Sequence, residues 1–212
     1  MARIDLHTHS YASPDGSLRA SHYKAMLDSG RLDYIAVTDH NRIDFAMELQ
    51  TELGPQIIIG EEITALEGEI IGLYLKRAVP AGLSAAETAE RIHAQGGLVY
   101  IPHPFETRRK GLPTATLDAI AKQIDIVETY NGRTLQDRSN LAGEWARGHS
   151  TAEAASSDAH GRRGWGRSYS SIAEPPTRTT LIKLLRAATF STKSTGVIGR
   201  LYPKLNRLRR HR

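Results

Sequence analysis

The chain has 212 residues, of which 40% are hydrophobic and 24% charged, and its formal net charge is +5. The length favours one domain, and the composition excludes a collagen-like fibre and wholesale disorder. No cysteine is present, which excludes disulfides, thiolate zinc sites, iron–sulfur clusters and cysteine nucleophiles. No apolar run reaches about 18 residues, so no stable membrane insertion is expected. The charged start does not resemble a signal peptide, and we expect a cytoplasmic location.

The excess positive charge is concentrated at the C-terminal end. Six basic residues and no acid fall within 200–212, so residues 1–199 carry a net charge of −1. Blocks of like charge at a terminus are usually disordered. We therefore expect residues 1–190 to form a single folded domain and residues 191–212 to form a flexible basic tail. The charge of this tail is suited to solvent, to nucleic acid or to another anionic surface.

Short apolar runs rich in Ile and Val alternate with helix-like segments along the domain. Continuous apolar runs of this length are typical of parallel strands buried on both faces. The clearest helix spans 84–95, where Ser84 and Glu87 form a capping box. The alternation predicts an α/β fold, either a barrel or a doubly wound sheet. In chain order we expect strands at 3–6, 34–37, 56–59, 70–75, 98–101, 125–128 and, more weakly, 151–155, and helices at 18–29, 45–53, 84–95, 117–123, 135–147 and 179–188.

Five of the nine histidines come just after predicted strands, most of them beside carboxylates. His7 and His9 are two positions apart, so both project to the same side of an extended segment. In an α/β barrel the carboxyl ends of the strands converge on one face, where active sites are built. Burying this many imidazoles and carboxylates away from water would cost much free energy if no metal ion bound them. We therefore predict a metal site. Its candidates are His7, His9, His40, Glu62, His103, Asp158 and His160.

The types of candidate ligand limit which metals can bind and which reactions those metals can support. Nitrogen and carboxylate oxygen without sulfur suit Zn, Mn or Fe. More than four candidate ligands imply more than one ion, and a carboxylate such as Glu62 can bridge two of them. Two ions about 3.5–4 Å apart generate hydroxide at neutral pH and clamp an in-line displacement, most often at phosphorus. The residues therefore predict a metal-dependent hydrolase.

Several ordered motifs over roughly residues 3–172 resemble the polymerase and histidinol phosphatase (PHP) superfamily. The resemblance implies a distorted (β/α)7 TIM-like barrel in a single domain, with two or three divalent metal ions at the carboxyl ends of the strands. It also implies a stand-alone metal-dependent phosphoesterase. The motifs are DLHTHS at 5–10, SPDG at 13–16, TDHN at 38–41, GEEI at 60–63, PHP at 102–104 and SDAH at 157–160.

The resemblance also implies how the ligands are grouped. His7, His9, Glu62 and Asp158 would hold the first ion. Glu62 would bridge to a second ion, which His103 completes. In many relatives a further histidine stands where this chain has Glu69, and a carboxylate there would favour a harder metal such as Mn. The alternative for Glu69 is an exposed residue at the start of a strand. Asp15, His40 and His160 would hold a third ion.

Substrate contacts are less clearly marked. Arg167 and Arg133 follow predicted strands or the SDAH motif, and arginine is the bidentate phosphate binder, although each is equally a candidate for a solvated loop residue. Asn131, together with Glu128, resembles a family position near the site, with either a substrate-contacting or a structural role. The basic residues 108–110 follow His103 and fit either a substrate entrance or a solvent-facing turn.

The leading hypothesis is hydrolysis of a phosphomonoester or phosphodiester by a metal-bound hydroxide. The substrate would be a small metabolite, a nucleotide or a short oligonucleotide. His7, His9, Glu62, His103, Asp158 and His160 would form the catalytic set, because they hold the ions or stand beside the leaving group. One alternative is a metal-dependent amidohydrolase, which shares the His-x-His pattern but often has a bridging lysine that no predicted strand end supplies. Another is a nucleic-acid-binding or scaffold protein that retains a metal site.

Overall fold

The computed structural model describes residues 1–134 and 136–210, so only the first residue of the helix expected at 135–147 lies outside the described residues. Its sheet has nine strands in the order β7-β6-β5-β4-β3-β2-β1-β8-β9. The strands are β1 (Ala2–Asp5), β2 (Tyr34–Val37), β3 (Ile57–Thr64), β4 (Glu69–Leu73), β5 (Leu98–Ile101), β6 (Ile126–Asn131), β7 (Ala152–Ser156), β8 (Ser168–Ile172) and β9 (Thr189–Thr192).

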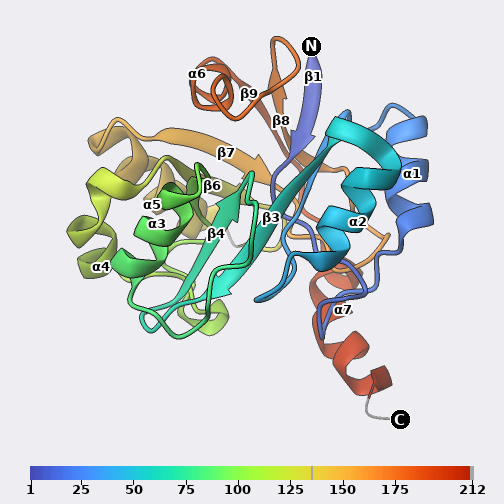
Figure 1. The fold of residues 1–212 in the computed structure, drawn as a ribbon, viewed down its shortest axis with the longest axis horizontal. Coiled ribbons are helices and arrows are strands. Elements are labelled where there is room, and N and C mark those ends of the chain that lie inside the picture. Colours follow the sequence, from blue (N-terminus) through green and yellow to red (C-terminus); the bar gives the residue numbers. More distant parts are fainter. Residues whose placement is uncertain (135, 211–212) are drawn as a thin grey trace.

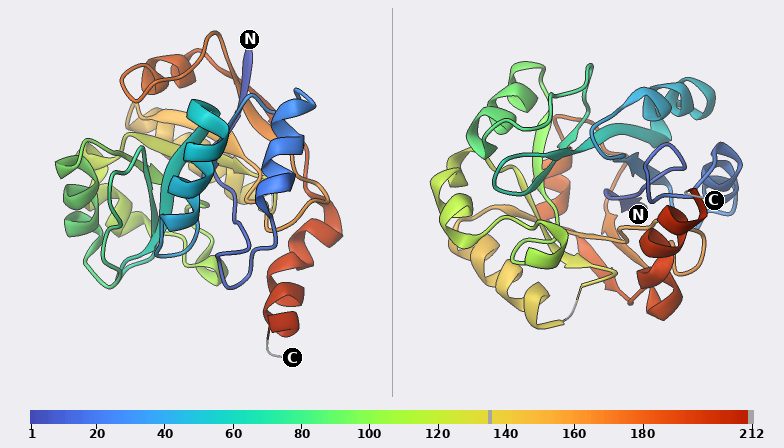
Figure 2. Two further views of the ribbon diagram at one scale, coloured as in Figure 1. Left: turned by 45° about the vertical axis from the view of Figure 1, so that its right-hand side comes forward. Right: turned by 90° about the horizontal axis from the view of Figure 1, so that it is seen from below.

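The sheet curls into a nearly closed barrel with the helices on its outside (Figure 1; Figure 2, right). Two hydrogen bonds join the end strand β7 to β8 across the gap in the barrel. Ser170 Oγ on β8 accepts from Ala155 N of β7 at 2.9 Å and donates to Ala155 O at 3.1 Å. The TIM-like α/β barrel predicted from the sequence is confirmed. The helices are α1 (Ala20–Asp28), α2 (Asp44–Leu53), α3 (Ala85–Ala94), α4 (Thr114–Ala119), α5 (Gln136–Gly148), α6 (Leu181–Arg186) and α7 (Gly196–Arg210), with 3-10 turns η1 (Gly54–Gln56), η2 (Thr107–Arg109) and η3 (Ala121–Gln123).

Two strands, β4 and β8, run against their neighbours. Strand β4 is antiparallel to both β3 and β5, and β8 is antiparallel to both β1 and β9, whereas β1–β3 and β5–β7 pair in parallel. Only residues 65–68 join β3 to β4, which is too short for the crossover that a parallel pair needs. The expectation of a parallel sheet is therefore wrong at β4 and at β8. The resulting hairpin extends β3 to Thr64, five residues beyond the predicted end of that strand.

Apolar side chains fill the barrel and the space beneath the helices. One buried cluster takes alternate residues from successive strands, such as Ile4, Ile58 and Tyr100, and includes Leu181 and Leu185 of α6. Helix α6 lies near the N-terminus, at the opposite end of the barrel from α7 (Figure 1). Two further clusters pack α3 and α5, and α1 and α2, against the outside of the sheet. The end of the barrel that faces α7 is left to polar loops.

The basic C-terminal segment forms a helix in this structure. Helix α7 lies at the carboxyl ends of the strands, and its last turns extend beyond the body of the molecule (Figures 1 and 2). Asn206 is buried and donates to the main-chain oxygens of Asp15 at 2.7 Å and His160 at 3.0 Å. These contacts hold α7 against the loops that carry the predicted metal ligands. No described helix is long and apolar enough to cross a bilayer.

The loop that follows β1 depends on one glycine. A Cβ on Gly16 would lie 1.9 Å from Ser10 O and 2.9 Å from His9 O, so Gly16→Ala must displace the backbone that carries His9 and Asp15. We expect the substitution to lower the free energy of unfolding by about 3 kcal/mol. Urea denaturation monitored by circular dichroism measures this loss. Gly148→Ala is the control, since a Cβ there meets nothing within 4 Å. Equal stability of the two variants would contradict the steric argument.

Candidate metal centre

The structure brings all nine predicted ligands together at the carboxyl ends of the strands. The loop after β1 carries His7 and His9, and it pairs with the loop after β7 through a parallel bridge between Thr8 and Ala159. That bridge places Asp158 beside the first two histidines, although more than 140 residues separate them in sequence. The other six ligands are Asp15 and His40 from the loops around α1 and β2, Glu62 within β3, Glu69 at the start of β4, His103 after β5, and His160 after β7.

The first group surrounds the Nε2 atoms of His7 and His9, which lie 3.1 Å apart. Glu62 Oε2 lies 3.5 Å from His7 Nε2 and 3.2 Å from His9 Nε2. On the other side, Asp158 Oδ1 lies 3.7 Å and 3.6 Å from the same two atoms. All four side chains are buried, so their ligand atoms face one another in a space shielded from bulk water.

The second group joins Glu62, Glu69 and His103. His103 Nε2 lies 3.1 Å from Glu62 Oε1 and 3.8 Å from Glu69 Oε2. Glu62 therefore presents one carboxylate oxygen to the first group and the other to the second. Glu69 is buried beside the cluster, which excludes the exposed alternative considered for it. Burial and the neighbouring charge of Glu62 raise the pKa of Glu69 to about 8.

The third group consists of Asp15, His40, His160 and also His9. Asp15 Oδ1 lies 3.5 Å from His160 Nε2 and 3.6 Å from His40 Nε2. His9 stacks on both imidazoles, with ring centroids 4.7 Å from that of His40 and 4.1 Å from that of His160. His9 thus stands between the first and third groups, whereas the sequence assigned it to the first group alone.

These residues fit divalent metal ions. Asp15 Oδ1 and His103 Nδ1 are buried without a hydrogen-bond partner, a costly state for polar atoms in the absence of a ligand. Four overlapping groups each bring three or four ligand atoms within 4.8 Å of one another. Imidazole nitrogen and carboxylate oxygen are the donors that Zn, Mn and Fe accept. The overlap of the groups suits a cluster of ions more than one isolated ion.

In the centre, burial and the neighbouring charges shift the pKa values of His7 and Asp158 in opposite directions. Burial alone would lower the pKa of His7, but the charges of Asp158, Glu128 and Glu62 raise it well above its usual value. Burial would raise the pKa of Asp158, but Arg133 and His7 lower it well below its usual value. Asp158 is therefore ionised at neutral pH and available to cations, as are Glu62 and Asp15, whose pKa values burial would raise but the neighbouring histidines lower. The raised pKa of Glu69, in contrast, favours its protonated form.

The ligands form the floor of a cleft with a volume of about 810 Å³ and a strongly basic rim. Its rim combines residues from the loop after β5, the loop after β6 and helix α7. Such a rim is positive over a floor rich in carboxylates, which favours an anionic ligand that reaches down to bound cations. The basic residues of the lining are Arg108, Arg109, Lys110, Arg133, Arg200, Lys204 and Arg207.

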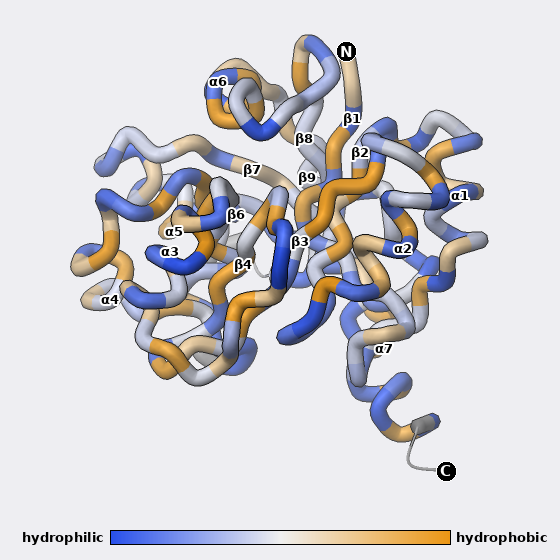
Figure 3. Tube along the Cα trace, in the orientation of Figure 1, coloured by the Kyte–Doolittle hydropathy of each residue, from blue (hydrophilic) through white to orange (hydrophobic). Residues whose placement is uncertain are grey.

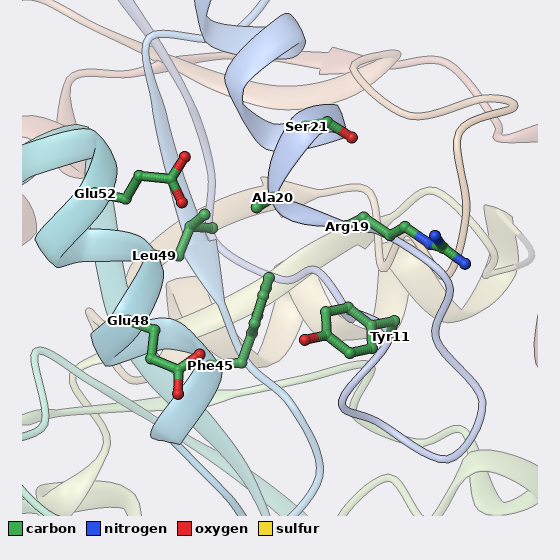
Figure 4. Close-up of a pocket in the computed structure, with 8 residues that line it drawn as sticks. All are labelled: Tyr11, Arg19, Ala20, Ser21, Phe45, Glu48, Leu49 and Glu52. Carbon is green, nitrogen blue, oxygen red and sulfur yellow. The ribbon is translucent and has the colours of Figure 1, made fainter.

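A second hollow lies on the outside of the barrel between the start of α1 and α2 (Figure 4). Its lining combines Tyr11 and Phe45, whose rings meet edge to face with centroids 5.1 Å apart, with Glu48 and Glu52 of α2 and with Arg19. Among the described residues, this lining includes no histidine and no group of three ligands. The cleft over the histidine cluster is therefore the candidate site.

No protein-family model matches the chain. An uncharacterized protein of Methanocaldococcus jannaschii, MJ1587, is 36% identical over 142 residues, which span 61% of this chain and 81% of that protein. A two-domain protein from Bacteroides vulgatus, described as containing a predicted PHP-like metal-dependent phosphoesterase, superposes with a TM-score of 0.66 at 17% identity, covering 97% of this chain and 63% of the other. The chain therefore has the barrel fold of this PHP-like protein.

Two further solved structures share the fold. A lesion-specific endonuclease from Pyrococcus furiosus superposes with a TM-score of 0.61 at 15% identity, over 89% of this chain and 57% of the other. An amidohydrolase from Chromobacterium violaceum, solved with sulfate and no metal, superposes with a TM-score of 0.62 at 17% identity, over 75% of this chain and 88% of the other. Structures with this fold are thus described with more than one activity.

Of the three predicted substrate contacts, Arg133 lines the cleft, Asn131 is buried next to Asp158, and Arg167 lies elsewhere. Arg133 Nη1 donates to both carboxylate oxygens of Asp158 at 3.0 Å. Asn131 Nδ2 donates to Asp158 Oδ2 at 3.2 Å, so it supports a ligand rather than facing open solvent. Arg167 is exposed and is not among the described residues that line the cleft. Arg167 therefore lies outside the cleft.

Two arginines of the cleft were not singled out from the sequence. Arg109, within the basic 108–110 segment, donates to Asp158 Oδ2 at 2.6 Å and to Asn131 Oδ1 at 3.1 Å. Arg207 of α7 donates to Asp15 Oδ2 at 2.6 Å. The segment 108–110 was marked by its charge, but nothing local distinguishes Arg109 from Arg108. Arg207 lies within a block of charge that favoured a solvated tail.

Proposed function

We propose that this protein is a metal-dependent phosphoesterase that acts on a small phosphorylated molecule or a short oligonucleotide. The observation that carries the proposal is the complete set of buried ligands on the floor of a cleft with a cationic rim. The fold neighbours described as a phosphoesterase and as a lesion-specific endonuclease support the same class of reaction. The set His7, His9, Glu62, His103, Asp158 and His160 is the proposed catalytic set.

The chain's own residues would divide the work of hydrolysis. Divalent ions bound by the cluster would activate water and offset the charge of the phosphoryl group. Arg133 and Arg109 meet at Asp158 on the floor of the cleft, where a guanidinium can bind a phosphate through two parallel hydrogen bonds. Lys204 and Arg207 stand on the rim and would hold the remainder of an anionic substrate. The reaction requires no serine or cysteine nucleophile.

A substrate panel tests the proposal. Protein purified without added metal is analysed for Mn, Zn and Fe, and each ion found is then used in assays of p-nitrophenyl phosphate, bis-p-nitrophenyl phosphate and short oligonucleotides. Turnover that depends on the ion and disappears with chelator supports the proposal. Metal-loaded protein that hydrolyses none of these phosphoesters contradicts it. The ratio of the first two rates separates monoester from diester preference.

The fold neighbour described as an amidohydrolase keeps a second function open. Lys110 is the lysine nearest the ligands in the described part of the chain, and its Nζ lies 4.0 Å from Glu69 Oε1. A metal-dependent amidohydrolase would cleave p-nitroacetanilide or N-acetylated amino acids with the same metal that the protein contains. Turnover of amides without turnover of phosphoesters would favour this function. We favour the phosphoesterase because the rim holds seven basic residues that an uncharged amide does not need.

Removal of metal is expected to destabilise the protein. Ions that bind the folded state alone add about 2.7 kcal/mol when the free concentration is about 100 times the Kd. In a chain of this length that gain raises the Tm by roughly 5–10 °C. Differential scanning calorimetry of chelated protein, with and without added Mn or Zn, measures the difference. Mg at the same concentration is the control, because it prefers oxygen ligands in octahedral geometry. A Tm that does not respond to Mn, Zn or Fe would contradict the metal site.

A further inference from the structure

Helix α7 presents three different faces along its 15 residues. One face packs on the body of the protein and includes the buried residues Pro203 and Asn206. A second face carries Arg200, Lys204 and Arg207, which line the rim of the cleft. Hydrophilic and hydrophobic positions alternate along α7 in Figure 3. The remaining apolar residues of α7 form the third face.

That third face is an exposed apolar ridge. On a helical projection of about 100° per residue, its members lie on the side opposite Gly199 and Asn206. Leucines scattered singly on a surface need no explanation, but a contiguous row along an exposed helix marks a contact surface. The ridge consists of Val197, Ile198, Leu201, Leu205 and Leu208, whose exposed fractions are 73%, 43%, 45%, 40% and 57%.

The segment that carries the ridge is basic. The sequence contains no Asp or Glu after Glu174, so no side chain of residues 175–212 is negative. The flank that faces the cleft meets a carboxylate of the body, since Arg207 pairs with Asp15 at 2.6 Å. A second copy of the chain on this ridge would bring two such flanks together, and like charges at that distance oppose association. Nucleic acid would satisfy the cations but would offer the five apolar side chains no apolar surface.

We propose that α7 docks the protein on an anionic lipid surface. A helix with a leucine-rich face and a lysine- and arginine-rich face lies in the plane of a bilayer interface, with the apolar side chains among the acyl chains and the cations at the headgroups. The ridge side chains are exposed, and the last turns of α7 extend beyond the body (Figure 1), so contact with a flat surface requires no rearrangement of the barrel. Each arginine or lysine near an anionic membrane adds to the attraction.

Vesicle sedimentation tests this proposal. The full chain is mixed with phosphatidylcholine vesicles that either lack or contain phosphatidylglycerol. We expect binding to the anionic vesicles to be at least about tenfold tighter than to neutral vesicles, and to weaken as salt is raised. Leu201→Gln with Leu205→Gln, which keeps good helix formers while removing the apolar ridge, should abolish binding. Arg209→Glu should weaken it without touching the cleft.

Matched controls keep the outcome clear. Leu66→Gln removes a leucine that is 74% exposed elsewhere on the protein, and it should leave vesicle binding unchanged. Circular dichroism and unchanged turnover of p-nitrophenyl phosphate, or unchanged metal content if phosphoesters are not substrates, show that the double variant is folded. Absence of binding to anionic vesicles overturns the proposal. Equal binding by the double variant also overturns it, as does a dimer in light scattering that the double variant dissolves.

Discussion

His7→Ala and Asp158→Asn are each expected to lower metal-dependent phosphoester hydrolysis by about 10³-fold or more, with the fold intact. His7 belongs to two of the four ligand groups, and its removal takes away one of the imidazoles that face Glu62 and Asp158. Asp158→Asn keeps the shape of the side chain and the left-handed backbone, in which φ is 51° and asparagine is well tolerated. What it removes is the negative charge that a cation requires.

The test measures both the rate of hydrolysis and the metal content of each variant. Both variants should bind less Mn or Zn per chain by elemental analysis, and their far-ultraviolet circular dichroism should match that of the unaltered protein. His93→Ala is the control, because His93 lies on α3, pairs with Asp125 at 2.9 Å and touches no ligand group. If either variant retains full activity, the assignment of the ligands is wrong. If His93→Ala loses activity equally, the loss is not specific to the cluster.

The positions of the histidine ligands were readable from the sequence because each comes soon after a predicted strand. Strands β2 and β5 coincide with the predicted segments 34–37 and 98–101, so His40 and His103 fall at the expected strand ends. The spacing of His7 and His9 likewise requires only an extended backbone after β1. Barrel geometry then brings these ends together, whatever the sequence separation between them.

Elements that depend on contacts between distant segments could not be predicted from the sequence. Strand β8 reads Ser-Tyr-Ser-Ser-Ile and lacks an apolar run, because its alternate residues are small polar side chains such as Ser168 and Ser170 that pack into the barrel's seam. Helix α7 was missed because its dense charge outweighed the spacing of its leucines. Both elements become stable only when the rest of the barrel supplies a surface for them.

The roles of two buried carboxylates outside the ligand set, Asp5 and Asp39, likewise could not be predicted from the sequence. Asp5 accepts from Ser157 Oγ at 2.5 Å and from Ser157 N at 3.0 Å, across 152 positions of sequence. Asp39 accepts from Ser10 Oγ at 2.5 Å and from Ser10 N at 2.7 Å. In the sequence these acids are indistinguishable from ligands, because both stand next to histidine motifs. In the structure they tie neighbouring loops together and so fix where the ligands point.

Glu128→Gln is expected to weaken metal binding or turnover by about 10–100-fold, although Glu128 is not one of the nine ligands. Its Oε1 accepts from His7 Nδ1 at 3.1 Å and from Tyr100 Oη at 2.9 Å. Its Oε2 accepts from His103 N at 2.7 Å and from Asn131 Nδ2 at 2.8 Å. All four partners are donors, so a carboxylate satisfies them and an amide, whose nitrogen cannot accept, does not.

The consequence for His7 separates this role from simple packing. Burial would raise the pKa of Glu128, but His7 lowers it below its usual value, so the group is ionised and can only accept from His7 Nδ1. The proton is thereby fixed on Nδ1, and Nε2 is left free to bind metal. We expect Glu128→Gln to raise the Mn or Zn concentration needed for half-maximal activity, measured by titration of chelated protein. Glu153→Gln, on the neighbouring strand β7, is the control. If Glu128→Gln loses stability but keeps its metal titration within about twofold, Glu128 is structural and does not position His7.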